Sequence, residues 1–180
     1  MSGGRGRTDP ERRQRIARAA IEVVAERGLE GLTHRAVAKQ AGVPLGSTTY
    51  HFSDREEMLE AAMREAAAET ERNLRAWADS VGPDDDLVDA LVELVRRDSS
   101  ERRGTVVSLE LYLAALKRPS LRDAAVRWSA NLRREVERFT DPLTAAALAA
   151  AADGILLASL ASGEPVDLAA AAAVLRRVER

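Results

Sequence analysis

Apolar side chains recur every three or four residues along most of the chain, which is the spacing of one face of an α-helix. Over residues 10–27 the positions with this spacing are Ile16, Ala20, Val23 and Val24. Gly28 is placed to end that helix. The strict alternation of apolar and polar residues that marks a strand is absent from the sequence. The pattern therefore predicts about nine helices, no strand and an all-α fold.

Capping residues mark the helix boundaries in the first third of the chain. Thr33 is placed to cap a short helix that Gly42 ends, and a third helix is expected from residue 44 or 45 to about residue 51. Ser53 and Glu56 match a capping box, which predicts that a long helix begins there and continues to Ser80. Its inward positions are Leu59, Met63, Ala66, Thr70, Asn73 and Trp77.

The rest of the chain is predicted to be a series of helices separated by short polar turns. These helices are expected over residues 87–97, 106–116, 119–139, 142–162 and from about 166 to the C-terminus. Residues 98–104 are expected to form a loop. The segment 106–116 is apolar nearly all round, which predicts a central buried helix.

Composition excludes several chemical functions. The chain has no cysteine, which excludes disulfides, thiolate nucleophiles and zinc–thiolate sites, and its two histidines leave little for a metal cluster or a catalytic dyad. No apolar run approaches the roughly 18 residues of a membrane span, and residues 1–10 lack the apolar core of a secretory signal. We therefore expect a cytoplasmic protein that is not an enzyme and that carries no cofactor and no metal.

Charge divides unevenly between the two ends of the chain. Residues 1–52 contain nine basic and five acidic side chains, residues 53–180 contain 18 basic and 24 acidic ones, and the net charge of −2 conceals this difference. A basic end on an acidic body favours a polyanionic partner at that end, and an ordinary solvated surface is the alternative. We expect a disordered basic tail at 1–8, an N-terminal unit at 9–52 and a larger helical body at 53–180.

Residues 33–52, with the sequence THRAVAKQAGVPLGSTTYHF, have the organisation of a helix-turn-helix. Ala41 allows the two helices to approach closely, Gly42 allows the sharp bend, and Val43 fills the space between the helices. The second helix is rich in hydroxyl groups, which can donate to phosphates or contact base edges. A small helical turn within a bundle is the alternative for this segment taken alone.

The sequence resembles the tetracycline-repressor (TetR) family of bacterial transcription regulators over about residues 11–60. The residues that carry the resemblance are Ala20, Gly28, Thr33, Val37, Ala38, Ala41-Gly42-Val43, Gly46, Tyr50-His51-Phe52 and Arg55-Glu56-Glu57-Met58. The resemblance implies an N-terminal three-helix DNA-binding unit, joined by a long helix to a larger effector-binding and dimerisation domain. It also implies a repressor that leaves a palindromic double-stranded DNA operator when a small molecule binds.

The second helix of the motif departs from the family pattern at Pro44, Leu45, Thr48 and Thr49. The tyrosine that the family often uses for a phosphate contact is therefore either lost or replaced by Tyr50. The candidate DNA-binding residues are Thr33, Arg35, Leu45, Gly46, Ser47, Thr48, Thr49, Tyr50, His51 and Arg55. If the tyrosine contact is lost, the alternative is a helical protein-interaction module that no longer reads DNA.

Polar and aromatic residues inside the predicted apolar helices mark a candidate effector site. A buried carboxylate requires a partner, which is either an arginine of the chain or a cationic or hydroxylated ligand. Aromatic side chains either line a ligand pocket or belong to the core. The candidate ligand-binding residues are Trp77, Glu110, Tyr112, Leu113, Trp128, Asn131 and Asp153. Together they predict a small apolar effector and leave a hydrogen-bonding group on it open.

The last two helices are candidates for self-association. Their alanine-rich stretches, 145–152 and 169–173, offer small faces for close helix packing, and packing within one chain is the alternative. The family resemblance implies a homodimer with a four-helix interface, in which effector binding shifts the long helix over 53–80. A small helical enzyme is a further alternative, but the sequence lacks a nucleophile–base pair, a phosphate-binding glycine loop and metal-ligand spacing.

Overall fold

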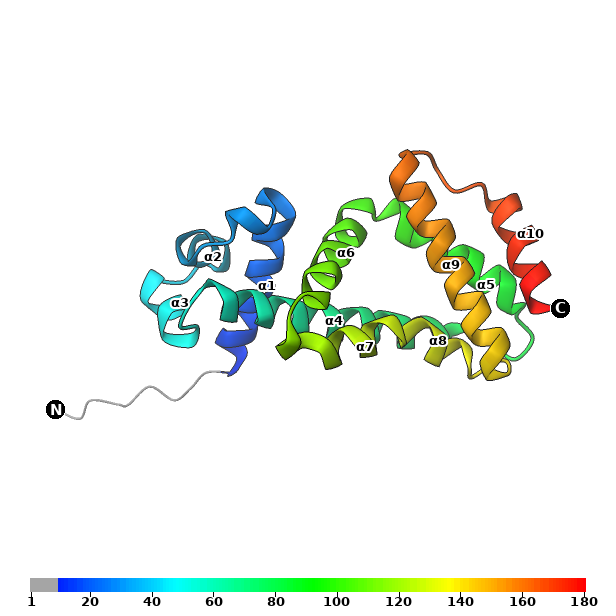
Figure 1. The fold of residues 1–180 in the computed structure, drawn as a ribbon, viewed down its shortest axis with the longest axis horizontal. Coiled ribbons are helices and arrows are strands. Elements are labelled where there is room, and N and C mark those ends of the chain that lie inside the picture. The colour runs from blue at the N-terminus through cyan, green and yellow to red at the C-terminus, as the bar shows by residue number, and fades with distance from the viewer. Residues whose placement is uncertain (1–9) are drawn as a thin grey trace.

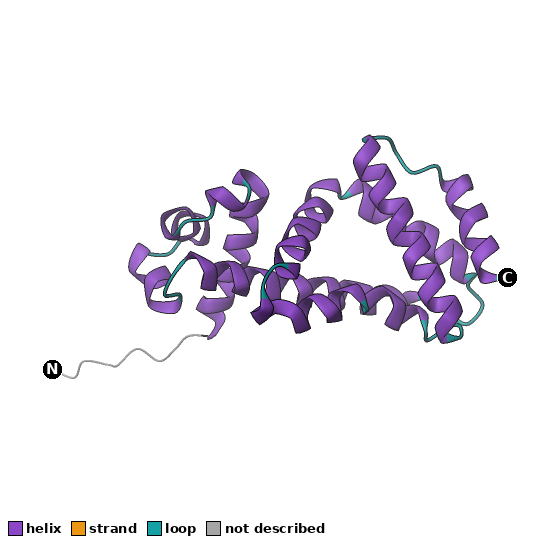
Figure 2. Ribbon diagram, viewed as in Figure 1, coloured by secondary structure: helices purple, strands orange, loops and turns teal. Residues whose placement is uncertain are grey.

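The computed structural model describes residues 10–180, and every regular element in that range is a helix (Figure 2). The N-terminal elements are α1 (Pro10–Arg27), the 3₁₀ turn η1 (Leu29–Gly31), α2 (His34–Ala41) and α3 (Leu45–His51). The others are α4 (Arg55–Ser80), α5 (Leu87–Ser100), α6 (Arg102–Leu116), η2 (Pro119–Leu121), α7 (Arg122–Ser129), α8 (Asn131–Val136), α9 (Pro142–Ser162) and α10 (Leu168–Glu179). The all-α prediction is confirmed, and the predicted tail at 1–8 lies outside the described residues.

Two regions in the middle of the chain differ from the prediction. The expected loop at 98–104 is almost entirely helical, because α5 continues to Ser100 and α6 begins almost at once. Ser99 and Ser100 each donate a hydroxyl to a carbonyl one turn earlier, at 2.8 and 2.7 Å, so their polar groups are satisfied within the helix. The expected helix over 119–139 is divided into α7 and α8 at Ala130, whose amide is shared between two carbonyls and closes α7.

Helix α6 is not the central buried helix that its composition predicts. Its buried residues are Val107, Leu111, Ala114 and Ala115. Leu113 and Leu116 point the other way, and each is 57% exposed. An apolar helix is buried on all sides only when other elements cover every side. In this chain α6 packs against α1, α4 and α7 and leaves its outer side open (Figure 1).

The N-cap of the long helix lies one residue later than predicted. Asp54, and not Ser53, is the N-cap of α4, and its carboxylate accepts a hydrogen bond from the Glu57 amide at 2.8 Å. The Glu57 carboxylate accepts in turn from the Ser53 amide at 2.8 Å, which lowers the pKa of Glu57. Aspartate is favoured at this position because its ionised carboxylate also interacts with the positive end of the helix dipole.

Helix α4 extends from the N-terminal unit into the C-terminal helices and contributes to two apolar clusters (Figure 1). The first cluster is built from α1, α2, the first half of α4, α6 and α7, and Phe52 closes it after α3. The second cluster joins Leu74 and Trp77, near the end of α4, to α5, α8, α9 and α10. The long helix therefore connects the two halves of the molecule through continuous packing.

Polar side chains hold α1 against α4. Arg18 and Gln14 donate to the Glu65 carboxylate at 2.9 and 3.1 Å, and Arg13 donates to Glu57 at 3.2 Å. Burial opposes ionisation of Glu65, but the hydrogen bonds from Gln14 and Arg18 outweigh it, so that the pKa of Glu65 lies below its usual value. Arg13 and Arg18 are therefore engaged within the protein.

Helix α9 is long and apolar enough to cross a membrane by length and mean hydropathy (1.8), whereas the sequence analysis expected no segment of that kind. Only 28% of its most apolar stretch is buried within the described chain. An exposed apolar helix face of this size requires a cover, either lipid or another protein surface.

Replacing Asp54 by alanine should lower the free energy of unfolding by about 1 kcal/mol, because the α4 amides lose their cap. Ser53→Ala is the matched control, since it keeps the backbone amide that donates to Glu57 and should change the unfolding free energy by less than about 0.5 kcal/mol. Urea denaturation followed by circular dichroism measures both values. A larger loss in Ser53→Ala than in Asp54→Ala would contradict the assigned cap.

Candidate nucleic-acid interface and ligand cavity

Three local features build the turn between α2 and α3. Thr33 caps α2 by accepting a hydrogen bond from the Ala36 amide at 3.2 Å, as predicted. Gly42 ends α2 in the left-handed conformation (φ 64°), which glycine adopts without a steric penalty. Val43 is half-buried against the first apolar cluster and fixes how the two helices meet. Helices α2 and α3 therefore form the expected helix-turn-helix.

Helix α3 presents one face to solvent. The exposed residues of this helix are Leu45, Gly46, Thr49 and Tyr50. Tyr50 is 66% exposed, and its ring lies edge-on to that of His51 with centroids 5.1 Å apart. Ser47 and His51 are half-buried. This face combines hydroxyl, aliphatic and aromatic groups, which are the groups a recognition helix uses on base edges and phosphates.

Thr48 does not belong to this face, although the sequence analysis placed it among the DNA-binding residues. It is fully buried (0% exposed), and its hydroxyl donates to the Leu45 carbonyl at 2.8 Å. At about 100° per residue, Thr48 falls on the side of α3 opposite its exposed residues. The hydroxyl therefore serves the packing of the motif.

The other predicted DNA-binding residues surround α3. Thr33 and Arg35 are exposed at the start of α2. Arg55, the first residue of α4, donates to the Leu29 carbonyl at 2.5 Å and lies 3.9 Å from the Glu30 carboxylate, with 45% of its side chain exposed. Arg55 therefore braces the turn before α2 and keeps part of its guanidinium accessible.

A cavity of about 750 Å³ lies between the N-terminal unit and the C-terminal helices. Its lining residues come from α1 and from every helix between α4 and α9. Tyr112 and Trp128 form an aromatic pair in its wall, with ring centroids 5.7 Å apart and a tilt of 50°. Ile21 and Ala25 of α1 also line it, so the helix-turn-helix unit contributes directly to the cavity. Its volume is that of a drug-sized ligand site.

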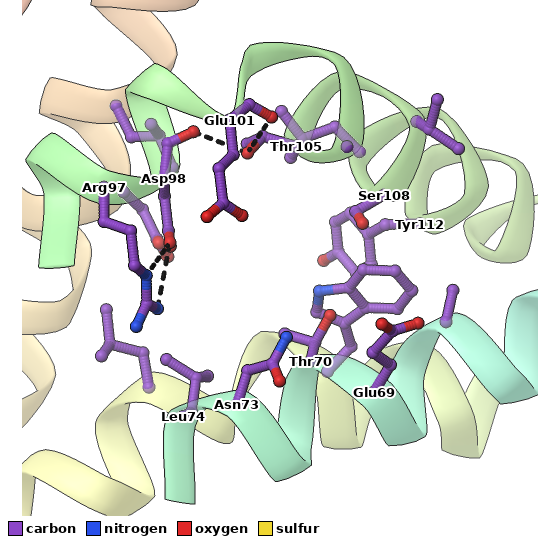
Figure 3. Close-up of a pocket in the computed structure, with 18 of the residues that line it drawn as sticks. Glu69, Thr70, Asn73, Leu74, Arg97, Asp98, Glu101, Thr105, Ser108 and Tyr112 are labelled. Atoms are coloured by element: carbon purple, nitrogen blue, oxygen red, sulfur yellow. Dashed lines mark hydrogen bonds and ion pairs between the residues drawn. The ribbon is translucent and has the colours of Figure 1, made fainter. Parts of the chain in front are cut away.

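Carboxylates outnumber guanidinium groups in the cavity wall (Figure 3). The acidic lining residues are Glu22, Glu69, Asp98, Glu101 and Asp153, and the basic ones are Arg97 and Arg103. Arg97 donates two hydrogen bonds to Asp98, each of 3.1 Å. Burial raises the pKa of Asp98 in spite of Arg97. Burial, and secondly the charge of Asp98, raise the pKa of Asp153, which also lines the cavity.

The structure brings three of the predicted ligand-binding residues to this cavity, namely Tyr112, Trp128 and Asp153. Trp77 is instead a core residue, 8% exposed, whose ring packs edge-on to Phe139. Its indole N–H donates to the Ala90 carbonyl at 3.2 Å, which satisfies its polar atom within the core.

The remaining three predicted ligand-binding residues lie elsewhere. Glu110 and Leu113 are exposed on α6 and do not line the cavity, because Tyr112 occupies the inward side of that turn. Asn131 is buried, accepts a hydrogen bond from Arg134 at 3.3 Å and lines a separate recess of about 190 Å³. Within residues 10–180, no three His, Asp or Glu side chains converge as metal ligands.

Most of the polar residues that line the cavity were not identified from the sequence, and four of them show why. Thr70 and Asn73 occupy predicted inward positions of the long helix, and their polarity within an otherwise apolar stripe is the signal that could have marked them. Asp98 and Glu101 fall in a segment predicted to be a loop. The structure shows instead that α5 passes almost directly into α6 at this segment, and that Asp98 and Glu101 line the cavity there.

Comparisons with known proteins identify the family. Residues 16–62 match "Bacterial regulatory proteins, tetR family", and residues 82–180 match "Tetracyclin repressor-like, C-terminal domain". The chain belongs to the TetR family. It is therefore a helix-turn-helix DNA-binding transcriptional regulator and not an enzyme.

The family likeness extends over nearly the whole chain. The HTH-type transcriptional regulator BetI of Stenotrophomonas maltophilia is 31% identical over 169 residues, which cover 87% of this chain and 85% of BetI. The crystal structure of the multidrug binding protein EbrR complexed with imidazole is 44% identical, with a TM-score of 0.79, and the match covers 94% of this chain and 96% of that chain. The TetR-family protein SCO1917 from Streptomyces coelicolor A3 is 43% identical, with a TM-score of 0.77 and coverage of 94% and 98%. EbrR has also been crystallised with malachite green, ethidium and proflavin.

Alanine substitutions at two neighbouring threonines of this TetR-family protein separate a packing role from a DNA-contacting role. Thr48→Ala should lower the free energy of unfolding by about 1 kcal/mol, because it removes a buried hydrogen bond. Thr49→Ala should leave that free energy within about 0.5 kcal/mol and should reduce the preference for the upstream region of its own gene over a scrambled duplex. Urea denaturation and fluorescence anisotropy measure the two effects. If the Thr48→Ala protein were as stable as the wild type but had lost its DNA preference, the packing role assigned to Thr48 would be wrong.

Proposed function

We propose that this TetR-family protein is a ligand-responsive repressor, a homodimer that binds a palindromic operator and releases it when a small organic cation enters the cavity. The observation that carries the proposal is that α1 of the DNA-binding unit and the C-terminal helices line one drug-sized cavity. The protein would act in the cytoplasm, where its operator DNA lies.

In the proposed complex the exposed face of α3 reads the operator. Leu45 and Thr49 would contact base edges, and the Tyr50 hydroxyl would reach a phosphate. Arg35 and the accessible part of Arg55 would contact phosphates on either side. A dimer places two such helices about 34–36 Å apart, or a multiple of this distance, which matches one turn of B-DNA and requires a palindromic site.

The chemistry of the cavity favours a positively charged aromatic effector over the purely apolar one expected from the sequence. The Tyr112–Trp128 pair offers ring faces that attract a cation, and the acidic lining residues outnumber the basic ones. The ligands in the solved EbrR complexes include ethidium, proflavin and malachite green, which are aromatic dyes. A cavity of about 750 Å³ lies in the size range of sites for drug-sized ligands.

Helix α6 provides a route from the cavity to the DNA-binding unit. Near its cavity end, Arg103 lies 3.9 Å from Glu26 of α1. Just after its other end, Arg118 forms an ion pair with Glu56 in the first turn of α4. A ligand that displaces α6 would therefore act on α1 and α4 together. Release requires that the ligand bind the DNA-free arrangement more tightly than the DNA-bound one.

Tetraphenylphosphonium, a lipophilic cation that does not intercalate into DNA, should weaken binding to the upstream region of the protein's own gene by roughly 5- to 150-fold. Neutral triphenylphosphine oxide is the matched control ligand and should have no such effect. Anisotropy titrations at two salt concentrations should also show that DNA affinity falls steeply with salt, because phosphate contacts release counterions. Equal DNA affinity with and without the phosphonium ion would contradict the proposed cationic effector.

The exposed side of α9 supports a homodimer. Its apolar and small residues are Leu143, Ala147, Ala150, Gly154, Leu157 and Ala161, separated alternately by four and three residues. Contact positions in helices that pack side by side have this spacing. None of the six residues is charged. Leu143 is 81% exposed in the single chain, which a second copy would bury. We therefore assign the apolar face of α9 to self-association together with α10, and not to a membrane.

Gly154→Leu tests this interface, because a Cβ at this position meets no atom within 4 Å in the single chain. The substitution should stabilise the protomer by up to about 1 kcal/mol through helix propensity, yet it fills the seam and should weaken the dimer at least about tenfold. Light scattering coupled to size-exclusion chromatography measures the dimer–monomer equilibrium. Ala76→Leu, on an exposed position of α4, is the matched control and should remain dimeric. A wild-type monomer, or an unweakened Gly154→Leu dimer, would contradict the interface.

A further inference from the structure

We propose that a second site, on the side of α4 away from the cavity, binds a small aromatic carboxylate. The site is the recess of about 190 Å³ that α4, α7 and α8 line together. Its charged and polar lining residues are Arg64 and Glu71 of α4, Arg127 of α7 and Asn131 of α8. The recess thus offers an anion two guanidinium groups and an amide.

The geometry of α4 separates the recess from the cavity. Arg64 and Glu71 line the recess, whereas Glu69 and Asn73 line the cavity. At about 100° per residue, these two pairs lie on roughly opposite sides of the helix. Trp128 of α7 lines both spaces. The recess is therefore a separate site that shares one aromatic wall residue with the cavity.

A buried amide at the recess has a donor without an acceptor. Asn131 is 3% exposed, and its Oδ1 accepts a hydrogen bond from Arg134 at 3.3 Å. Because a guanidinium only donates, this contact fixes which end of the amide carries the oxygen. Within residues 10–180 the NH₂ group of Asn131 donates no hydrogen bond, yet its nitrogen is not fully enclosed. An acceptor brought by a ligand would satisfy this donor, which is costly to leave unpaired.

Positive charge at the recess is not neutralised by the chain. Within the described residues, no ion pair joins Arg64 or Arg127 to a carboxylate, and Arg64 donates to the uncharged Ser120 carbonyl at 3.0 Å. The acidic lining residue, Glu71, is engaged by Arg75 at 3.3 Å and by a second arginine at 4.0 Å. The recess therefore favours an anionic ligand over a cationic one.

The apolar part of the recess suits a single aromatic ring. Its apolar lining residues are Trp128 and the three alanines Ala67, Ala68 and Ala124, whose small side chains leave the space open. An apolar cavity of about 150 Å³ is large enough to bind benzene, so a recess of about 190 Å³ can hold one ring with a short polar group. A carboxylate fits best as that group, because it accepts two parallel hydrogen bonds from one guanidinium.

Benzoate and its neutral isostere benzamide test the site in the full-length protein. The chain has two tryptophans, so a ¹H–¹⁵N NMR spectrum contains two indole N–H signals, and Trp128→Phe assigns them. Benzoate should shift the Trp128 signal to saturation and leave that of Trp77, which lies in the second apolar cluster. Benzamide should bind at least about tenfold more weakly, because it brings no charge to the guanidinium groups.

Variants assign the contacts within the recess. Arg127→Gln should weaken benzoate binding at least about tenfold. Asn131→Asp should do the same, because it keeps the acceptor for Arg134 but replaces the free donor by a second carboxylate oxygen. Arg122→Gln is the matched control, since it removes the same charge from an exposed position of α7 that does not line the recess. Arg103→Gln alters the cavity alone, and neither of these last two changes should weaken benzoate more than about twofold.

The absence of a saturable shift at Trp128 would overturn the proposed site, and so would equal affinities for benzoate and benzamide. Binding that is lost in Arg103→Gln and kept in Arg127→Gln would place benzoate in the cavity instead. Equal weakening by Arg122→Gln and Arg127→Gln would show a response to net charge and not to a built site. These outcomes leave the cationic effector of the cavity untouched, because tetraphenylphosphonium tests it separately.

Discussion

The long helix α4 must pack into two separate apolar clusters, and the rest of the molecule is arranged around this constraint. Its first half supplies Met58 and Met63 to the cluster of the DNA-binding unit, and its end supplies Leu74 and Trp77 to the C-terminal cluster. Between the two clusters about two turns of α4, residues 67–73, belong to neither, and Glu69, Thr70 and Asn73 of this stretch line the cavity. The cavity is thus the space that remains where one helix passes from one core to the other, and a ligand bound there would contact the helix that both cores share.

Local signals in the sequence were sufficient for most helix boundaries. Thr33 and Asp141 cap their helices through their own side chains, and Gly42 ends α2 in a conformation that favours glycine. These interactions involve residues only a few positions apart, so a single sequence contains all the information they need. The predicted N-cap of α4 was wrong by one residue, because serine and aspartate both suit an N-cap and the sequence pattern does not show whether Ser53 or Asp54 takes the position.

The burial of individual side chains was harder to predict, because periodicity shows which residues share a face but not what covers that face. The aromatic residues illustrate this limit. Tyr112 meets Trp128 in the cavity wall, whereas Trp77 meets Phe139 in the second core. Tyr112 and Trp128 lie on consecutive α-helices, α6 and α7, whereas Trp77 and Phe139 are brought together from segments far apart in the sequence. Only the packing of the helices decides which pair remains accessible to a ligand.

The distribution of charge also constrains how the proposed ligand could release DNA. Arg13 and Arg18 of α1 are held by carboxylates of α4, so these two guanidinium groups already have partners within the protein. A cationic ligand adds positive charge to the protein, which by itself would strengthen attraction to DNA, although screening limits this effect beyond about 8 Å at physiological salt. Electrostatics therefore opposes release. Release by a cation must come from the movement of helices that line the cavity, and α1 is the one that lies in both the cavity wall and the DNA-binding unit.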